Sequence, residues 1–165
     1  MAKFRVEGGH RLSGEITPQG AKNEALQIIC AALLTPERVV LHNVPIIADV
    51  MQLLELLEAI GVKVERLSED SFALTAADIN LDYLRTAACH RRCRRLRGSV
   101  MMIGPLLARF GVGFMPKPGG DKIGRRRLDT HFLGFQKLGA KFDVAASAEF
   151  YTVEAKRLKG TYMLL

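Results

Sequence analysis

Four cations follow a glycine pair and Asp121 in the segment PGGDKIGRRRLD, residues 118–129. Glycines let a loop approach a ligand closely, and arginine binds phosphate or carboxylate through paired hydrogen bonds. Neighbouring positive charge lowers the pKa of a carboxylate, so Asp121 acts as an acid only if burial or a ligand phosphate raises that pKa. The segment predicts a site that holds a polyanion and moves a proton. The alternative is an aspartate in an ordinary turn.

The same segment leads into LDTHF, which places Asp129 and His131 at the start of a predicted helix. Aspartate is a favourable N-cap residue, because its carboxylate accepts hydrogen bonds from the first backbone N–H groups. Both side chains are therefore site candidates, and the alternative is an N-cap followed by an exposed histidine.

A second candidate site is the segment QGAKNEAL, residues 19–26. A glycine precedes a predicted helix whose first turn carries Lys22 and Asn23. The unpaired N–H groups and the dipole of a helix N-terminus attract anions, to which Lys22 adds a charge and Asn23 an amide. The alternative is a solvated first turn.

Five arginines fall between residues 91 and 97, ahead of an apolar stretch. If this segment is helical, the five side chains cannot share one face. Arg97 directly precedes the Gly-Ser pair that opens the apolar stretch, so it alone is well placed to point along the helix start. Most of the other four arginines are predicted to belong to a solvated basic turn.

The composition favours one cytoplasmic domain with anionic partners. The 165 residues are 48% hydrophobic and 25% charged, and the formal net charge is +7, a balance typical of a folded protein that meets phosphorylated ligands or nucleic acid. Cys30, Cys89 and Cys93 are an odd number without disulfide spacing, which fits a reducing compartment. Cys89, His90 and Cys93 suggest zinc, but they lack a second ligand pair, so no metal site is predicted. No signal or membrane segment is recognised.

Hydrophobic periodicity predicts alternating helices and strands. Strands are expected at residues 3–7, 38–44, 62–67, 71–76 and 112–115, and helices at 21–34, 50–60, 97–109 and 129–138. The helices at 21–34 and 97–109 are apolar nearly all round, which predicts deep burial. Asp49 and Gln52 resemble a capping box, and Gly61 and Gly139 are expected to end their helices.

The pattern recurs along the chain. ALQIICAALL aligns with SVMMIGPLLA, LLEAIGVKVE with GFQKLGAKFD, and RLSG with RLKG. The sequence therefore predicts two α/β units and the first strand of a third. The final GTYMLL would be a strand without a covering helix, which indicates a fragment of a longer chain; a natural edge strand is the alternative.

Four ordered motifs resemble the UDP-N-acetylglucosamine enolpyruvyl transferase family: GAKNEAL, LRGSVMMIGPLLARFG, PKPGGDKIGRRRLDTHF and LGAKF. The likeness runs from Phe4 to Leu165. It implies an inside-out α/β prism of βαβαββ-type repeats, with helices inside and sheets outside, here about two repeats and the start of a third. Residues 1–20 would be strands that join a second domain, and residues 21–165 an incomplete N-terminal catalytic domain. The second domain would be absent from this chain.

The resemblance implies transfer of the enolpyruvyl group of phosphoenolpyruvate to the 3′-hydroxyl of UDP-N-acetylglucosamine, the first committed step of peptidoglycan synthesis, without a cofactor. It places Lys22 and Arg97 on the charges of phosphoenolpyruvate, Arg126 on its phosphate and Asn23 on the sugar. The residues expected along the uracil and diphosphate are Arg127, Leu128, Asp129 and His131. The family usually has proline where this chain has Arg127.

Most family members carry a cysteine where this chain has Asp121, and some carry aspartate. The thiol is linked to proton donation and product release, so the resemblance assigns Asp121 the role of proton donor. A carboxylic acid can protonate the methylene carbon of the enol if its pKa is held up. It should resist the epoxide fosfomycin, which traps a thiolate. The glycines would let this loop close as a lid.

Two other readings stay open. The positive charge also suits a nucleic-acid-binding module, although aromatic residues make up only 7% of the chain and tryptophan is absent, which leaves little for base stacking. The chain is also expected to be inactive alone, because the catalytic groups of the second domain are absent. The predicted partners are the two small substrates and that domain, with neither nucleic acid nor membrane.

Overall fold

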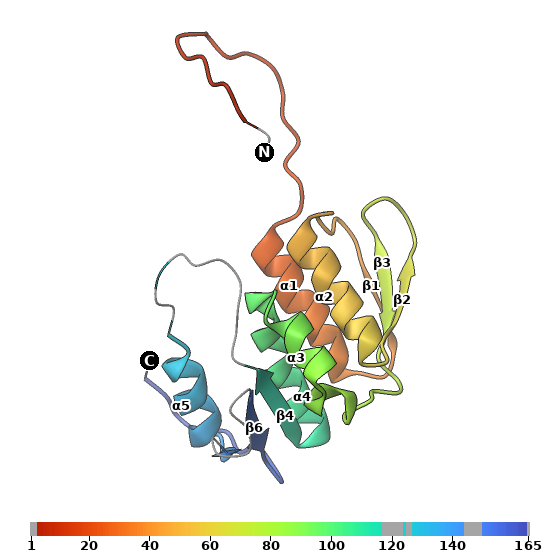
Figure 1. Cartoon of the computed structure of the whole chain (residues 1–165), viewed down its shortest axis with the longest axis vertical. Coiled ribbons are helices and arrows are strands. Elements are labelled where there is room, and N and C mark those ends of the chain that lie inside the picture. The colour runs from red at the N-terminus through yellow and green to blue at the C-terminus, as the bar shows by residue number, and fades with distance from the viewer. Residues whose placement is uncertain (1–2, 117–123, 125–126, 144–149, 165) are drawn as a thin grey trace.

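The computed structural model describes residues 3–116, 124, 127–143 and 150–164. Residues 3–20 contain no helix or strand and extend away from the rest of the molecule (Figure 1). The predicted strand at residues 3–7 is therefore wrong. Phe4 and Val6 are 99% and 89% exposed, and no described segment pairs with their backbone, which a strand needs.

The first α/β unit contains two helices and a three-stranded sheet. Its elements are α1 (Lys22–Ala31), the 3₁₀ turn η1 (Ala32–Leu34), β1 (Arg38–Leu41), α2 (Ala48–Ala59), β2 (Lys63–Arg66) and β3 (Phe72–Thr75). The antiparallel sheet has the order β1-β3-β2, and α1 and α2 lie side by side next to it (Figure 1). This confirms the helices and strands predicted for this part of the chain. Gly61, at φ +104°, follows the end of α2.

The second unit repeats this plan. Its elements are the 3₁₀ helix η3 (Arg97–Met102), α4 (Ile103–Phe110), β4 (Val112–Pro116), α5 (Asp129–Lys137), β5 (Lys141–Asp143) and β6 (Phe150–Glu154). Its antiparallel sheet has the order β4-β6-β5, so the last strand is central in both units. The predicted internal repeat is therefore confirmed.

Two differences from the predicted elements concern the segment that joins the units. The short elements η2 (Tyr83–Arg85) and α3 (Ala87–Cys93) were not predicted, and the chain turns after them, before Arg97. The helix expected at 97–109 is divided into η3 and α4. Pro105 explains this division, because proline lacks an N–H group and its ring clashes with the carbonyl four residues earlier, so it is tolerated only in a first helical turn.

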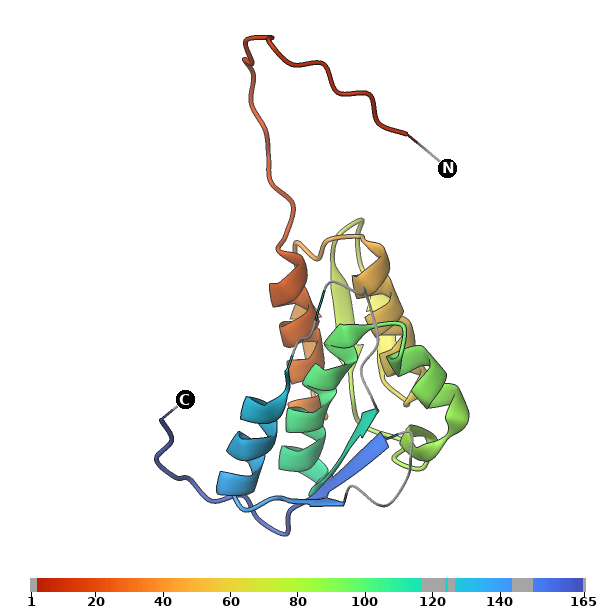
Figure 2. The ribbon, with the colours of Figure 1, turned by 60° about the vertical axis from the view of Figure 1, so that its left-hand side comes forward.

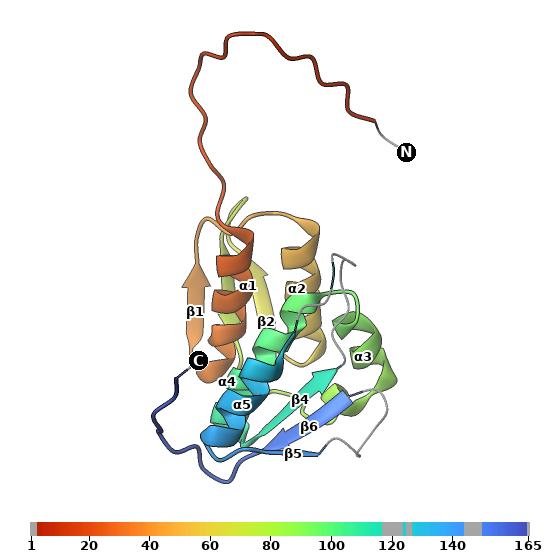
Figure 3. The same ribbon diagram turned by 90° about the vertical axis from the view of Figure 1, so that its left-hand side faces the viewer.

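The helices α1, α2 and α4 occupy the centre of the molecule, the two sheets lie outside them, and α5 lies at one edge (Figures 1 and 3). Central side chains from α1, η1, α2 and α4 are fully buried, among them Ile29, Leu33, Leu53, Leu57 and Leu106. Burial of the segment 21–34 is nevertheless one-sided, since Ile28 of α1 and Leu34 of η1 are 43% and 52% exposed. The expectation that this helix is buried all round is wrong, because its described packing partners lie on one side.

Beyond β6 the described chain, residues 155–164, forms no strand, so the predicted first strand of a third unit is not found there. Tyr162 and Leu164 are 86% and 80% exposed, and no strand partner covers them. The Lys159 N–H donates to the Leu138 carbonyl at 2.9 Å, which ties this segment to the end of α5. Within the described residues, no helix is long and apolar enough to cross a membrane.

Candidate functional site

A pocket of about 370 Å³ lies between α1, the segment around the start of η3, and the start of α5. Its charged and polar lining includes Lys22, Asn23, Asp49, Arg95, Arg97, Arg127 and His131, and its apolar lining includes Leu26, Met101 and Leu128. Four cations therefore face one carboxylate. An excess of positive charge around a concave site favours a polyanionic ligand.

The start of α1 depends on Gly20. A β-carbon at this position would lie 1.9 Å from the Asn43 carbonyl oxygen, so only glycine lets the chain pass. Ala21 is the N-cap residue of α1 and provides no side-chain cap for the first-turn N–H groups. Lys22 and Asn23 follow in that first turn, where the uncapped N–H groups and the helix dipole favour an anion.

Lys22 is held by an acid from the other helix of its unit. Its Nζ lies 2.9 Å from Asp49 Oδ2, and both side chains are partly exposed. The predicted capping box is wrong, because α2 begins at Ala48 with Ile47 as its N-cap residue. The Asp49 carboxylate pairs with Lys22, and Gln52 Oε1 is buried without a hydrogen-bond partner among the described residues.

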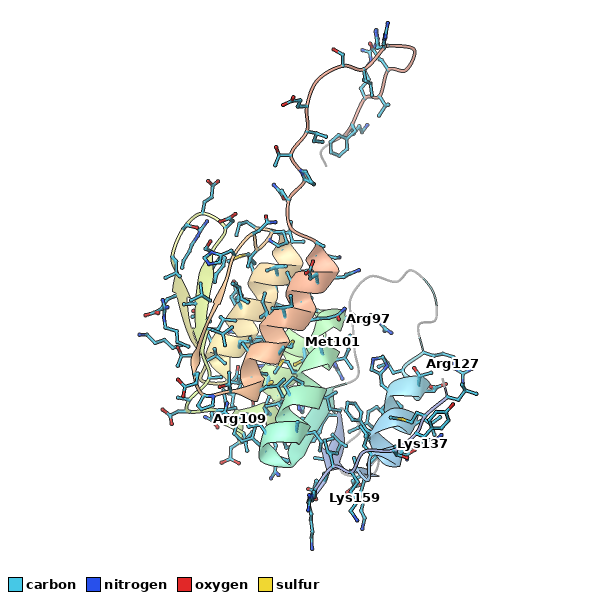
Figure 4. The ribbon with its side chains drawn as sticks, turned by 180° about the vertical axis from the view of Figure 1, so that it is seen from behind. Arg97, Met101, Arg109, Arg127, Lys137 and Lys159 are labelled. Atoms are coloured by element: carbon cyan, nitrogen blue, oxygen red, sulfur yellow. The ribbon has the colours of Figure 1, made fainter. Side chains whose placement is uncertain are left out.

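Arg97 reaches the same pocket because η3 packs tightly against α1. A β-carbon at Gly98 would lie 3.0 Å from Leu26 Cδ1, so a larger residue here would push the two elements apart. Figure 4 shows Arg97 and Met101 between α1 and α5, and both line the pocket. The predicted pairing of Lys22 with Arg97 at one site is thus supported by their common position.

The third wall is the start of α5, which lies beside α4 (Figure 2). Arg127, Leu128 and His131 line the pocket here. Asp129 is not among the lining residues. It forms an ion pair with Arg127 through both Nε and Nη2. The predicted N-cap role of Asp129 is wrong, because Leu128 is the N-cap residue and Asp129 is already in the helix.

Six of the nine predicted site residues therefore line one pocket: Lys22, Asn23, Arg97, Arg127, Leu128 and His131. Asp129 contacts the pocket only through Arg127. Asp121 and Arg126 lie outside the described residues. Sequence reasoning missed two other lining residues. Asp49 was expected only as part of a capping box, and its pairing with Lys22 leaves no local signal in the sequence. Arg95 lies in an exposed turn, as predicted, but it also lines the pocket.

Residues 6–163 match the family model of EPSP synthase (3-phosphoshikimate 1-carboxyvinyltransferase). The chain belongs to the EPSP synthase family. Within the family it is 57% identical over its whole length to a UDP-N-acetylglucosamine 1-carboxyvinyltransferase of Bacteroides fragilis. It is 45% identical over 163 residues to the protein of the same name from Bradyrhizobium diazoefficiens.

The chain covers 38% of the Bacteroides protein and 36% of the Bradyrhizobium protein. Among solved structures, it is similar to the enolpyruvyl transferase NikO from Streptomyces tendae, with a TM-score of 0.67 at 24% identity. That match covers 92% of this chain and 32% of NikO. It confirms the α/β enolpyruvyl transferase fold that the sequence motifs implied.

The cysteines of this EPSP synthase family member are free thiols. Cys89 Sγ and Cys93 Sγ lie 3.9 Å apart. The neighbouring His90 has other partners: its Nε2 lies 3.1 Å from the Leu84 carbonyl oxygen, and its ring packs on Phe150. No group of three possible metal ligands occurs in the described part of the chain. The hydrogen bond between Cys89 and Cys93 lowers the pKa of the Cys89 thiol and raises the pKa of the Cys93 thiol. Burial raises the pKa of the Cys30 thiol to about 12.

Proposed function

We propose that this chain supplies part of an enzyme that transfers the enolpyruvyl group of phosphoenolpyruvate to the 3′-hydroxyl of UDP-N-acetylglucosamine. The observation that carries this proposal is the common pocket. Residues from three separate motifs, which the family resemblance assigns to these two substrates, line a single cationic cavity. The name of the relatives that are 45–57% identical supports the same substrates.

In the proposed reaction, the sugar hydroxyl oxygen bonds to C2 of the enol while a proton is added to its terminal methylene carbon. The resulting tetrahedral ketal then loses phosphate and one methyl proton. Negative charge is thus present on carboxylate and phosphate throughout. Lys22 and Arg97 are proposed to hold these anions, and cations fixed in advance stabilise such charge more effectively than water does.

The nucleotide sugar is proposed to lie toward α5, with Asn23 contacting the sugar and Arg127, Leu128 and His131 along the uridine diphosphate. The Arg127–Asp129 ion pair would then position Arg127 beside the diphosphate. Arg126 is proposed to contact the phosphate of phosphoenolpyruvate, and Asp121 to protonate the methylene carbon. Asp121 in place of cysteine would also make the enzyme insensitive to fosfomycin. No cofactor is needed for these steps.

The group that accepts the hydroxyl proton is proposed to belong to a second domain, which residues 3–20 would join. The proposed setting is the cytoplasm and peptidoglycan synthesis. The full-length protein should release phosphate only when both phosphoenolpyruvate and UDP-N-acetylglucosamine are present. Absence of release with both substrates present would contradict the proposal. Tight, salt-sensitive binding of duplex or single-stranded nucleic acid, unaffected by UDP-N-acetylglucosamine, would instead identify a nucleic-acid-binding protein.

A further inference from the structure

We propose that Arg95 is a second pocket arginine, which binds a substrate phosphate together with Arg97. Arg95 and Arg97 both line the pocket between α1 and α5. The inference rests on the proposed function for the identity of the substrates, and on the local backbone for the position of the side chain.

The backbone between the two arginines is extended. Leu96 has φ −131° and ψ 113°, and in an extended chain alternate side chains point to the same side. Leu96 itself is 3% exposed and belongs to the main hydrophobic core, although it also borders the pocket. Its two neighbours therefore leave the core on the same side, and both line the pocket. On a continuous helix they would have diverged.

The turn that carries the two arginines is fixed from inside. The Ser99 hydroxyl is buried and lies 2.7 Å from the Leu96 carbonyl oxygen and 3.1 Å from that of Cys93. The Leu96 N–H donates to the Cys93 carbonyl at 3.2 Å, and the Arg95 N–H to that of Arg92 at 3.1 Å. The side chain of Arg95 therefore starts from an ordered backbone, which reduces the entropy cost of binding an anion.

The pocket cations differ in whether a carboxylate of the chain pairs with them. Lys22 pairs with Asp49, and Arg127 pairs with Asp129. No ion pair of Arg95 with a carboxylate is found in the part of the chain that the structure describes. A guanidinium presents a planar fork of donors that matches phosphate oxygens. Its ligand is accordingly a phosphate group, carried either by phosphoenolpyruvate or by the nucleotide sugar.

Arg95→Gln in the full-length protein tests this inference, with Arg91→Gln as the matched control. Arg91 lies in the same basic segment and is exposed, but it is not among the pocket-lining residues. Arg95→Gln should lower kcat/KM about tenfold, the effect of losing one charge-assisted hydrogen bond. Arg95→Lys should recover part of this loss, because it keeps the charge but not the fork.

Two inhibitors identify the source of the phosphate. If Arg95 binds the phosphate of phosphoenolpyruvate, Arg95→Gln weakens inhibition by inorganic phosphate and leaves inhibition by UDP unchanged. If Arg95 binds the diphosphate, the reverse holds. Either result supports the inference. It is overturned if neither inhibition constant changes by more than about twofold, or if Arg91→Gln changes them equally.

Calorimetric titration of inorganic phosphate and of UDP separates this test from that of the proposed function. These titrations need no turnover. If the wild-type protein binds either probe and Arg95→Gln weakens that binding while Arg91→Gln does not, the arginine pair is supported even where no enolpyruvyl transfer is detected. If binding to the wild-type protein and to Arg95→Gln is equal, the inference fails, whether or not the enzyme is active.

Discussion

The two α/β units share a topology but differ in how firmly their second helix is held. In the first unit, α2 buries five residues: Val50, Leu53, Leu54, Leu56 and Leu57. In the second unit, the equivalent helix α5 buries none. Its attachment depends on Phe132, which packs edge-on against Phe142 and Tyr151, and on Phe135, which packs against Phe142.

This difference separates two kinds of pocket wall. Lys22 and its partner Asp49 lie on helices that are anchored in the main core, whereas Arg127 and His131 lie at the start of a helix that is only partly buried. Local opening is least costly where few apolar side chains are buried. The first unit therefore provides a firmly held wall of the pocket, and the start of α5 provides a wall that can move at little cost in free energy.

The largest expected effect is on catalysis, at Lys22. Lys22→Met should reduce kcat/KM by about 10²–10³-fold, as expected for removal of a preorganised charge from an electrostatic site. Arg127→Gln, on the adjustable wall, should reduce it by less than about tenfold. Steady-state phosphate release from the full-length protein measures both, and Lys63→Met on the distant strand β2 is the control. Equal losses at Lys22 and Arg127 would remove the distinction between the two walls.

The next effect is on stability. Leu57→Ala in α2 should lower the free energy of unfolding by about 2–5 kcal/mol, because it leaves a cavity in a fully buried site. Phe135→Ala at the corresponding position of α5 should cost less than half as much, although it removes a larger side chain. Urea denaturation followed by circular dichroism measures both. A larger cost at Phe135 would show that α5 is the better anchored helix.

The smallest effect is a pH dependence at the contact between α3 and the second sheet. Burial lowers the pKa of His90 below 6.5, opposed by its hydrogen bond to Leu84 and assisted by the charge of Arg94. The unfolded chain therefore takes up the proton first as the pH falls. The free energy of unfolding should be highest above pH 6.5 and decrease below it, by at most about 1.4 kcal/mol per pH unit for one proton.

Denaturation at pH 7.5 and 5.5 tests this expectation. His90→Gln should reduce the difference between the two pH values, and His10→Gln, in the extended N-terminal segment, should leave it unchanged. An undiminished difference in His90→Gln would show that other groups cause the pH dependence.

Local periodicity was sufficient for most of the fold. The helices and strands of the first unit follow from apolar spacing, and Gly61 and Gly139 lie beyond the ends of α2 and α5 as predicted. The short elements α3, β5 and β6 were missed, because a seven-residue helix and strands of three and five residues give weak patterns. The strand at residues 3–7 was predicted wrongly because alternation cannot supply a partner strand.

Sequence motifs at helix starts predicted most of the residues that line the candidate site. They did not predict which residues pair with each other, or which side chains the backbone conformation directs toward the pocket. Asp49 resembled an N-cap, but its carboxylate pairs with Lys22, 27 residues earlier. Asp129 also resembled an N-cap, but its carboxylate pairs with the neighbouring Arg127. Arg95 was assigned to solvent because the segment was read with a helical period. Arg95 does lie in an exposed turn, as predicted, but it also lines the pocket, and no local sequence signal indicates this second position.

The most direct test of the common pocket is a crystal structure of the full-length protein with UDP-N-acetylglucosamine and inorganic phosphate. The account predicts ligand density between α1, η3 and α5, with Lys22 or Arg97 within hydrogen-bond distance of a phosphate oxygen and Leu128 beside the nucleotide. Density for the nucleotide sugar elsewhere, with no ligand atom near Lys22 and Arg97, would contradict it.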